Sequence, residues 1–388
     1  MRKKVFSFVM ICAMAATLIG CGSSTTSSTA TASTAASKAA STVASTATSV
    51  ATSTAASKAA STAASSSATS SATTSTSSSA DDFKNTDMSK YKTDGMSIGV
   101  SFGQNVHPFF KAMQKGIEDA CSAYGITKVS VQSADSTLEK QVTQIENLAT
   151  SGITSLLVNP YDSAGVATAV QSAIDAGVNV FSMDISIDGA SPTYHIASDN
   201  KKIGTMLAQK LDEMLGGEGK IAILDDPSVS SLKLRQEGFE EYIKNNTKIE
   251  IVADQLGAIQ RTDALAAAET VLQAHPDIDA FVGINENSAM GIASAIQSAG
   301  LSDKGIIVTG VDSTEDVMSG IKDGTLAFGV AQNPYQMGYM SVQNAIKVYN
   351  GETVDDVIEL DCEYMTKDNV DQYIEREAAY NTDTSSTS

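Results

Sequence analysis

Short apolar runs alternate with longer amphipathic stretches over most of this 388-residue chain. The runs are rich in valine, isoleucine and leucine and end at glycine or polar residues, a pattern typical of strands buried on both faces. They cover residues 96–102, 129–132, 155–158, 178–183, 220–224, 249–253, 280–284, 306–311 and 326–331. The stretches between them repeat apolar residues at helical spacing, as in Val142, Ile145 and Leu148. This alternation predicts an α/β fold in which helices cover both faces of parallel sheets.

The patterned region extends from about residue 92 to residue 373. That length is close to the limit of ~250–300 residues at which a single hydrophobic core stops growing, so we expect two lobes. Glycines that follow the predicted helices, such as Gly125, Gly152 and Gly177, fit C-terminal caps and mark the breaks between elements.

The first twenty residues have the three parts of an export signal. Arg2, Lys3 and Lys4 precede an apolar stretch, residues 5–18, that is too short to span a membrane as a mature helix. We therefore interpret residues 1–20 as a signal peptide. The quartet Leu-Ile-Gly-Cys at residues 18–21 resembles a bacterial lipobox, which implies that Cys21 becomes the lipid-modified first residue of the mature protein.

A segment of almost pure serine, threonine and alanine follows Cys21. The decapeptide STAASKAAST occurs at residues 33–42 and again at 53–62, which indicates growth by duplication. Such a segment lacks the large apolar side chains that offset the entropy of ordering a chain. We expect residues 21–93 to be a disordered tether and residues 377–388 to be a disordered tail.

Charge and cysteine content exclude several classes of function. The formal net charge of −19 argues against a broad nucleic-acid-binding surface. Cys121 and Cys362 lie far apart in the chain, and we expect both to be buried free thiols. The sequence contains no HExxH or CxxC motif and only three histidines, so we expect no metal site and no cofactor.

Polar side chains recur where the predicted strands end. In parallel sheets, ligands bind beyond these carboxyl ends, so side chains placed there converge on one cleft. The positions are Asn159, Asp184, Asn285, Asp312 and Gln332, with Arg235 at the start of a predicted helix and Phe109 and Phe110 after the first strand. Taken singly, each polar residue also fits a helix cap or an Asx turn, and the two phenylalanines fit a helix core. Together they offer donors, acceptors and a flat apolar face, which suits a monosaccharide.

Several short motifs carry a resemblance to a known family. They include HPFF at residues 107–110, VNPYDS at 158–163, HIASDN at 195–200, LRQEGF at 234–239, GVDS at 310–313 and VAQNPYQMG at 330–338. The chain resembles the ribose-binding-protein group of type I periplasmic binding proteins, the substrate receptors of sugar ABC importers. The resemblance covers about residues 95–365.

The resemblance implies two Rossmann-like lobes and a three-strand hinge with crossings near residues 197–199, 331–333 and 361–363. Lobe 1 would contain residues 94–198 and 333–361, and lobe 2 residues 199–332 and 362–376. It also implies that the side chains of Ser101, Asn105, His107, Phe109, Phe110, Asn159, Asp184, Arg235, Asn285, Asp312 and Gln332 contact the ligand.

The sequence departs from the family pattern at two positions. An arginine is expected directly after Asp184, where this chain has Ile185, and the aromatic expected near residues 255–260 is missing, with Ile259 the nearest apolar residue. Either another side chain, such as Asp188, Lys233 or His107, replaces the missing guanidinium, or the ligand has a different pattern of hydroxyls.

We therefore interpret the chain as a lipid-anchored, monomeric receptor on the extracytoplasmic side of the cell membrane. It would bind a pentose, hexose or cyclitol between its lobes and deliver it to an ABC permease. Asp184 and Asp312 would act as carboxylates, with an affinity that is flat across neutral pH. The alternatives are a signal receptor of the same fold, a lac-repressor-like core, which would need a DNA-binding segment before the lobes, and a glycosidase, which would need two catalytic carboxylates.

Overall fold

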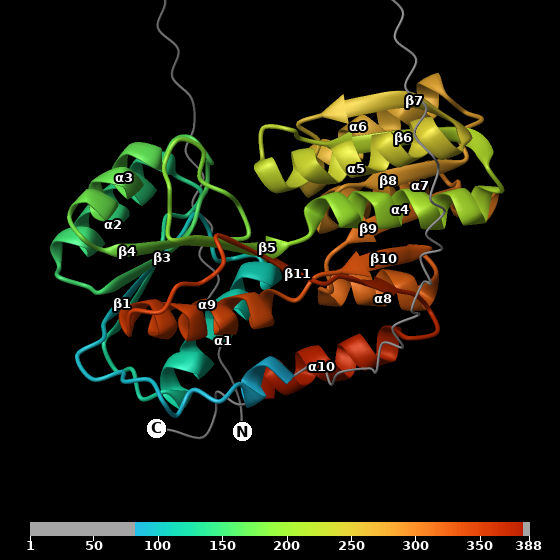
Figure 1. The fold of residues 1–388 in the computed structure, drawn as a ribbon. Coiled ribbons are helices and arrows are strands. Elements are labelled where there is room, and N and C mark those ends of the chain that lie inside the picture. The colour runs from blue at the N-terminus through green and yellow to red at the C-terminus, as the bar shows by residue number, and fades with distance from the viewer. Residues whose placement is uncertain (1–81, 383–388) are drawn as a thin grey trace, which may run out of the picture. The chain divides into compact units, whose positions relative to one another are not determined.

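The computed structural model describes residues 82–382 of the chain (Figure 1). The predicted signal peptide, Cys21 and most of the predicted tether lie outside the described residues. None of the described helices is both long enough and apolar enough to span a membrane.

The first lobe is built on a six-stranded parallel sheet in the order β11-β5-β4-β3-β1-β2. Its strands are β1 (Ile98–Phe102), β2 (Val129–Ser133), β3 (Ser155–Asn159), β4 (Asn179–Met183), β5 (Tyr194–Ser198) and β11 (Val357–Leu360). Helices α1 (Pro108–Ala123) and α9 (Pro334–Tyr349) form one layer, and α2 (Leu138–Thr150) and α3 (Ala167–Asp175) form the other.

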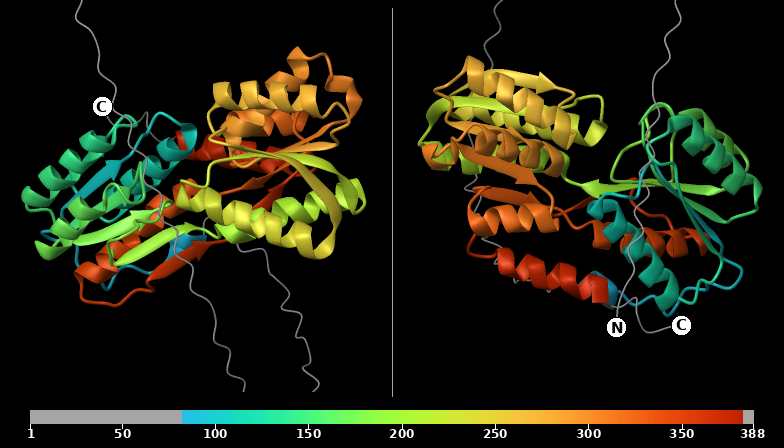
Figure 2. Two further views of the ribbon diagram at one scale, coloured as in Figure 1. Left: turned by 90° about the horizontal axis from the view of Figure 1, so that it is seen from above. Right: turned by 180° about the vertical axis from the view of Figure 1, so that it is seen from behind.

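The second lobe has a sheet of the same design in the order β12-β10-β9-β8-β6-β7. Its strands are β6 (Glu218–Asp225), β7 (Lys248–Leu256), β8 (Ala280–Gly283), β9 (Ile307–Val311), β10 (Phe328–Ala331) and β12 (Glu363–Met365), and β12 alone among these runs antiparallel to its neighbour. Helices α4 (Asn200–Leu215) and α5 (Ser230–Asn246) form one layer, and α6 (Arg261–Ala274), α7 (Glu286–Ser298) and α8 (Glu315–Asp323) lie on the other side. Figure 2 shows each sheet between its helices.

The chain passes between the two sheets three times in the described residues. It leaves β5 for α4, returns from β10 to α9, and leaves β11 for β12. Each connection spans one or two residues, so the two lobes are held together by short links of the kind that act as hinges.

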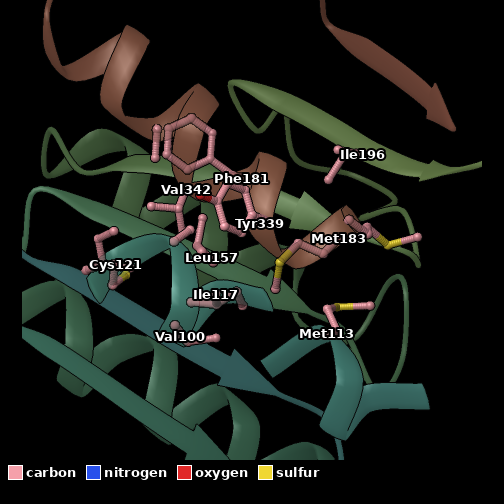
Figure 3. Packing of buried hydrophobic residues seen from close by; sticks show 14 of the residues in the cluster. Val100, Met113, Ile117, Cys121, Leu157, Phe181, Met183, Ile196, Tyr339 and Val342 are labelled. Carbon is pink, nitrogen blue, oxygen red and sulfur yellow. The ribbon is translucent and has the colours of Figure 1, made fainter. Parts of the chain in front are cut away.

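Apolar residues of strands and helices interlock in each lobe. In the first lobe, Val100, Leu157 and Phe181 of the sheet pack against Ile117 of α1 and Val342 of α9 (Figure 3). All five side chains are fully buried. Burial of a side chain of this size stabilises a fold by about 1.5–3 kcal/mol relative to exposure, so this layer is a main source of stability.

Paired glycines bring the helices of one layer together in both lobes. A Cβ on Gly116 of α1 would lie 2.1 Å from a backbone carbonyl oxygen of α9, and one on Gly338 of α9 would lie 2.0 Å from a carbonyl oxygen of α1. Gly204 of α4 and Gly238 of α5 make the same reciprocal approach at 1.8 and 2.1 Å. No side chain fits at these distances, so these helices require glycine to pack backbone against backbone.

Two expectations about the chain ends are wrong. Residues 82–93, predicted as tether, pack on the first lobe: Phe83 of the short 3-10 helix η1 (Asp82–Asn85) is buried in its core, and Lys90 pairs with Glu352 at 3.0 Å. The predicted tail contains the end of helix α10 (Val370–Thr382). Both segments were misjudged because one or two buried aromatic side chains, rather than a long apolar pattern, hold them in place.

Helix α10 touches both lobes. Tyr373 is buried in the second lobe, and Glu377 Oε1 accepts a hydrogen bond from Ser313 Oγ at 3.3 Å. Tyr380 is buried in the first lobe, where its ring stacks on Tyr335 of α9 with centroids 3.9 Å apart. The helix is therefore a further, non-covalent link between the lobes.

All nine predicted strands are present, and the α/β fold is confirmed. Strands β5, β11 and β12 were not predicted, because each carries polar or charged residues in place of a continuous apolar run. Cys121 and Cys362 are buried and free, as expected.

Candidate functional site

A cavity of about 180 Å³ lies at the carboxyl ends of the strands and is lined by residues of both lobes. This volume is below the ~300–1,000 Å³ of sites for drug-sized ligands, so it suits a smaller molecule. Of the predicted site residues, the lining includes His107, Phe109, Phe110, Asn159, Asp184, Arg235, Asn285, Asp312 and Gln332.

Two predicted site residues do not line the cavity. Ser101 is fully buried inside β1, where its hydroxyl lies 3.4 Å from Gln144 Oε1. Asn105 donates from Nδ2 to Gln114 Oε1 of α1 at 3.0 Å. Both side chains serve the scaffold in this structure: the position of Ser101 within β1 places its hydroxyl beside α2, and the loop between β1 and α1 turns Asn105 toward α1.

The aromatic pair stands at the first turn of α1. Pro108 occupies the first helical position, where its missing N–H is not needed, and His107 caps the helix by accepting from Phe109 N at 3.3 Å. Phe109 and Phe110 meet edge to face, with centroids 5.2 Å apart and planes at 86°. This arrangement fixes two ring faces at the cavity wall.

Asp184 and Asp312 sit directly after β4 and β9 with unusual backbone geometry. Their φ angles are +64° and +87°, in the left-handed region that non-glycine residues seldom occupy, and aspartate tolerates it better than most. Both residues are only 6% exposed. The turn points each carboxyl group into the cavity mouth, and such local strain is typical of sites where side-chain position matters more than stability.

The charge of Asp184 differs from what the sequence analysis expected. Burial raises the pKa of its carboxyl to about 7; the Asp312 charge adds to this rise, and the Arg235 charge opposes it. This raised pKa differs from the behaviour expected of an ordinary carboxyl, because the sequence does not reveal how completely the site is closed off from water. That ligand affinity is flat across neutral pH stays a prediction.

Arg235 supplies a fixed positive charge. It is 3% exposed, and its Nε and Nη1 donate to Asn200 Oδ1 at 2.8 Å and to the carbonyl oxygen of Ile284 at 3.0 Å. These two bonds hold the guanidinium plane while part of the group faces the cavity.

The amide side chains are held as firmly. Asn159 Nδ2 donates to the carbonyl oxygen of Met183 at 3.1 Å, and Asn285 caps α7 and donates to the carbonyl oxygen of Ile259 at 3.2 Å. Gln332 Nε2 donates to Asp312 Oδ1 at 2.6 Å. The cavity is therefore a preorganised set of donors and acceptors rather than a collection of mobile side chains.

Comparison with known proteins identifies the family. A family model described as "Periplasmic binding protein domain" matches residues 98–353. The chain belongs to the periplasmic binding protein family.

Sequence and structural relatives agree with this assignment. This periplasmic binding protein is 35% identical over 263 residues to the ribose import binding protein RbsB of Bacillus subtilis (strain 168), which covers 68% of this chain and 84% of the relative. It is 28% identical over 242 residues to the D-allose-binding periplasmic protein of Escherichia coli (strain K12), covering 60% and 78%. A solute binding protein from Bacillus halodurans C-125 with bound myo-inositol superposes with a TM-score of 0.68 at 27% identity, covering 74% and 99%. The family acts outside the cytoplasm, and so does this member.

The two sequence departures both reach the cavity of this periplasmic binding protein. Ile185 and Ile259 line it, next to Val229 and Leu232. Of the side chains considered as replacements for the missing arginine, His107 lines the cavity, whereas Asp188 and Lys233 are exposed and do not.

Sequence reasoning missed several lining residues of this periplasmic binding protein. They are Gly103, Ser136, Pro160, Tyr161, Val229, Ser231, Leu232, Gln260 and Asn287. It also missed Gln141, a fully buried residue of α2 whose amide bridges the carbonyl oxygen of Asn159 at 2.8 Å and the N–H of Tyr161 at 2.7 Å. A polar residue on the apolar face of a predicted helix was the available signal for Gln141.

Proposed function

We propose that this protein binds a monosaccharide or a similar small polyol between its two lobes and delivers it to an ABC importer. The observation that carries the proposal is the cavity itself, where two carboxyl groups, one guanidinium, six side-chain amides and an aromatic pair converge from both lobes. A polyol presents several hydroxyl groups around an apolar ring, which matches this mixture of groups.

One acceptor in the cavity wall lacks a partner. Gln332 Oε1 is buried and has no hydrogen-bond partner among the described residues, while the same amide donates to Asp312. A buried acceptor left unpaired costs about 1–3 kcal/mol, which a ligand hydroxyl would recover. Asp184 and Asp312 would accept further hydroxyl protons, and Arg235 would donate to hydroxyl or ring oxygens.

Binding would be coupled to closure of the lobes. Because the lining residues come from both lobes, a ligand makes its full set of contacts only when the lobes are together, so it favours the closed form. The short connections after β5, β10 and β11 would bend, and the closed form would then dock on a membrane permease.

The proposal includes a lipid anchor on Cys21, a monomeric state and the absence of catalysis. Relatives of the chain are named as import binding proteins, and the two aspartates have a direct use as hydroxyl acceptors. The raised pKa of Asp184 follows from burial and needs no role in proton transfer.

A ligand screen tests the proposal. Thermal unfolding of the purified protein would be measured with D-ribose, D-allose, D-fucose, D-tagatose and myo-inositol, with amino acids as a control set. A ligand at 100 times its Kd stabilises a protein by about 2.7 kcal/mol, so a true ligand gives a clear shift. No shift with any polyol, or recovery of a chemically altered sugar after incubation, would contradict the proposal.

A further inference from the structure

A buried charge contact connects the two lobes across the cavity. His107, at the start of α1 in the first lobe, places Nε2 3.1 Å from Oε2 of Glu286, the first residue of α7 in the second lobe. The side chains are 17% and 4% exposed. The two atoms are not aligned for a full hydrogen bond, and Glu286 Oε2 has no other polar partner among the described residues. The Glu286 carboxylate therefore faces an N–H group when the His107 ring is neutral and forms an ion pair when the ring is protonated.

Glu286 is held in place from within its own lobe. Arg261 of α6 lies 3.2 Å from Glu286 Oε1, and the same nitrogen lies 2.7 Å from Asp316 of α8. Glu286 also stands in the first turn of α7, where a negative charge is favourable. These contacts leave the second carboxylate oxygen facing the first lobe, so Glu286 presents a fixed, desolvated charge to whatever closes over it.

His107 is oriented with equal precision in the opposite lobe. Its Nδ1 accepts from Phe109 N at 3.3 Å, which places the proton of the neutral ring on Nε2, the atom that faces Glu286. Its ring meets Phe110 edge to face at 6.1 Å. The contact thus ties the aromatic pair of the first lobe to α7 of the second.

Two neutral contacts also cross the cleft. Ser230 Oγ of α5 lies 3.4 Å from Ser163 Oγ and accepts from Ser186 N at 3.3 Å. Neutral hydrogen bonds near solvent contribute about 0.5–1.5 kcal/mol, and pairs that include a charged group contribute about twice that. The contact between His107 and Glu286 is accordingly the stronger of these links.

We propose that His107 and Glu286 form a latch that holds the two lobes closed over the bound ligand. Glu286 is then a positioning residue, since it acts on the ligand through closure of the lobes. His107 lines the cavity and also takes part in closure through its contact with Glu286. This inference rests on the proposed function for its biological use, but the contact between His107 and Glu286 is formed in the protein without a ligand.

The latch gives closure a characteristic pH dependence. Glu286, Asp312, Arg261 and Asp184 are the charged groups that act on His107. Burial lowers the pKa of His107, but Glu286 and Asp312 outweigh it, so the pKa is raised overall. Separating the lobes moves Glu286 away from His107, so the His107 ring binds its second proton more tightly in the closed form than in the open form. Protonation of the ring gives up the hydrogen bond from Phe109 N to Nδ1 but completes the ion pair with Glu286. The ion pair is fully present below the ordinary histidine pKa of ~6.5 and weakens as pH rises through the raised value.

The main test measures closure without ligand. Spin labels on Glu146→Cys of α2 and Thr270→Cys of α6, both exposed, report the distance between the lobes. At pH 6 we expect Glu286→Gln and His107→Gln each to raise the open-to-closed ratio about tenfold, or ~1.4 kcal/mol. The double variant should be no more open than either single variant, because both remove the same contact.

Ligand affinity and pH supply the second readout. With D-ribose and with myo-inositol, Glu286→Gln should raise Kd about tenfold through faster dissociation, and the difference from wild type should shrink from pH 6 to pH 8.5. Asp184 titrates in both proteins, so taking the difference between the variant and the wild type reduces its contribution to the measured pH dependence. Glu269→Gln, an exposed charge on α6, should change neither quantity.

The outcomes separate the latch from the proposed function. Distance distributions that do not change in Glu286→Gln, or effects of the two single variants that simply add, would overturn the latch. Failure of every polyol to bind would overturn the proposed function, while the distance measurement would still decide the latch. Circular dichroism and melting temperature confirm that each variant is folded.

Discussion

The two lobes place the same polar residues at matching points of their sheets. In the orders β11-β5-β4-β3-β1-β2 and β12-β10-β9-β8-β6-β7, the fourth strand is followed or ended by an asparagine, Asn159 or Asn285, and the third by an aspartate with positive φ, Asp184 or Asp312. The fold therefore delivers one amide and one carboxylate from each side of the cavity.

The lobes differ in the helix that follows the fifth strand of each sheet. In the first lobe this is α1, which begins with Phe109 and Phe110, and in the second lobe it is α5, which carries Arg235. One lobe thus offers a flat apolar surface and the other a positive charge. The comparison teaches that the shared scaffold provides the same hydrogen-bonding groups in each lobe. The helix after the fifth strand differs between the lobes, and this difference determines how a ligand is oriented in the cavity.

The charge of the second lobe gives the largest expected effect. Arg235→Ala should raise the Kd of the bound polyol more than a hundredfold, about 3 kcal/mol, because it removes charge-assisted hydrogen bonds and leaves Asn200 and Asp184 without their cation. Titration calorimetry measures this loss. Lys233→Ala, an exposed change on the same helix, is the control, and a Kd within threefold of wild type for Arg235→Ala would mean that Arg235 does not contact the ligand.

The matched aspartates can be separated by pH. Asp184→Asn should weaken ligand binding yet stabilise the empty protein at pH 8. The folded state holds a proton at Asp184 up to about pH 7, so the free energy of unfolding of the wild type declines as pH rises from about 4 to 7. We expect the variant to remove a decline on the order of 1–4 kcal/mol.

Urea unfolding at pH 5 and pH 8 measures that decline. Asp312→Asn is the equivalent change in the other lobe and shows whether the two positions respond alike. An equal pH dependence of stability in wild type and Asp184→Asn would show that the Asp184 carboxyl is better solvated than its burial indicates.

The aromatic surface of the first lobe should matter less. Phe110→Ala removes one ring face and its edge contact with Phe109 but leaves each polar group paired, so Kd should rise about tenfold, or ~1.4 kcal/mol. Phe110→Leu keeps most of the apolar volume and should lose less affinity. If Phe110→Ala binds more weakly than Arg235→Ala, the apolar lobe rather than the charged one dominates binding.

A positive charge added to the first lobe should make the two lobes more alike in the groups that they offer to the ligand. Ile185→Arg places a guanidinium beside Asp184, where the family pattern has one, and should strengthen D-ribose binding about threefold to tenfold. Calorimetry with D-ribose checks it, with Ile185→Met as the uncharged control. Weaker ribose binding in Ile185→Arg would indicate a pocket shaped for a ligand with an apolar edge.

A strand could be predicted from the sequence where its consecutive residues are buried, because burial then appears as an uninterrupted apolar run. Strands such as β3 and β9 contain adjacent apolar residues and are buried along almost their whole length, whereas β12 has three residues at a sheet edge and carries Glu363, so no pattern could form. The polar residues after the strands were predictable for the same reason: the end of each apolar run marks the edge of the sheet, where the next side chain reaches the cavity.

The remaining parts depend on contacts between distant segments. Glu286 looked like an ordinary acidic residue in a first helical turn, and only the folded chain brings it to His107. Asn105 stands close to the aromatic pair in sequence but turns to Gln114, because the loop conformation rather than the spacing decides its direction. Such tertiary pairings have no local signature in the sequence.

Helix α10 changes how the lobes can be observed. Tyr373 packs in the core of the second lobe, and Tyr380 stacks on Tyr335 of the first lobe. When the lobes separate, either the stacking of Tyr380 on Tyr335 is lost or the helix moves relative to the second lobe. A fluorophore attached near Tyr380 would lie beside the first lobe, although the start of α10 packs in the second lobe. Its signal would follow the angle between the lobes, which makes this helix a built-in attachment point for a reagentless polyol sensor.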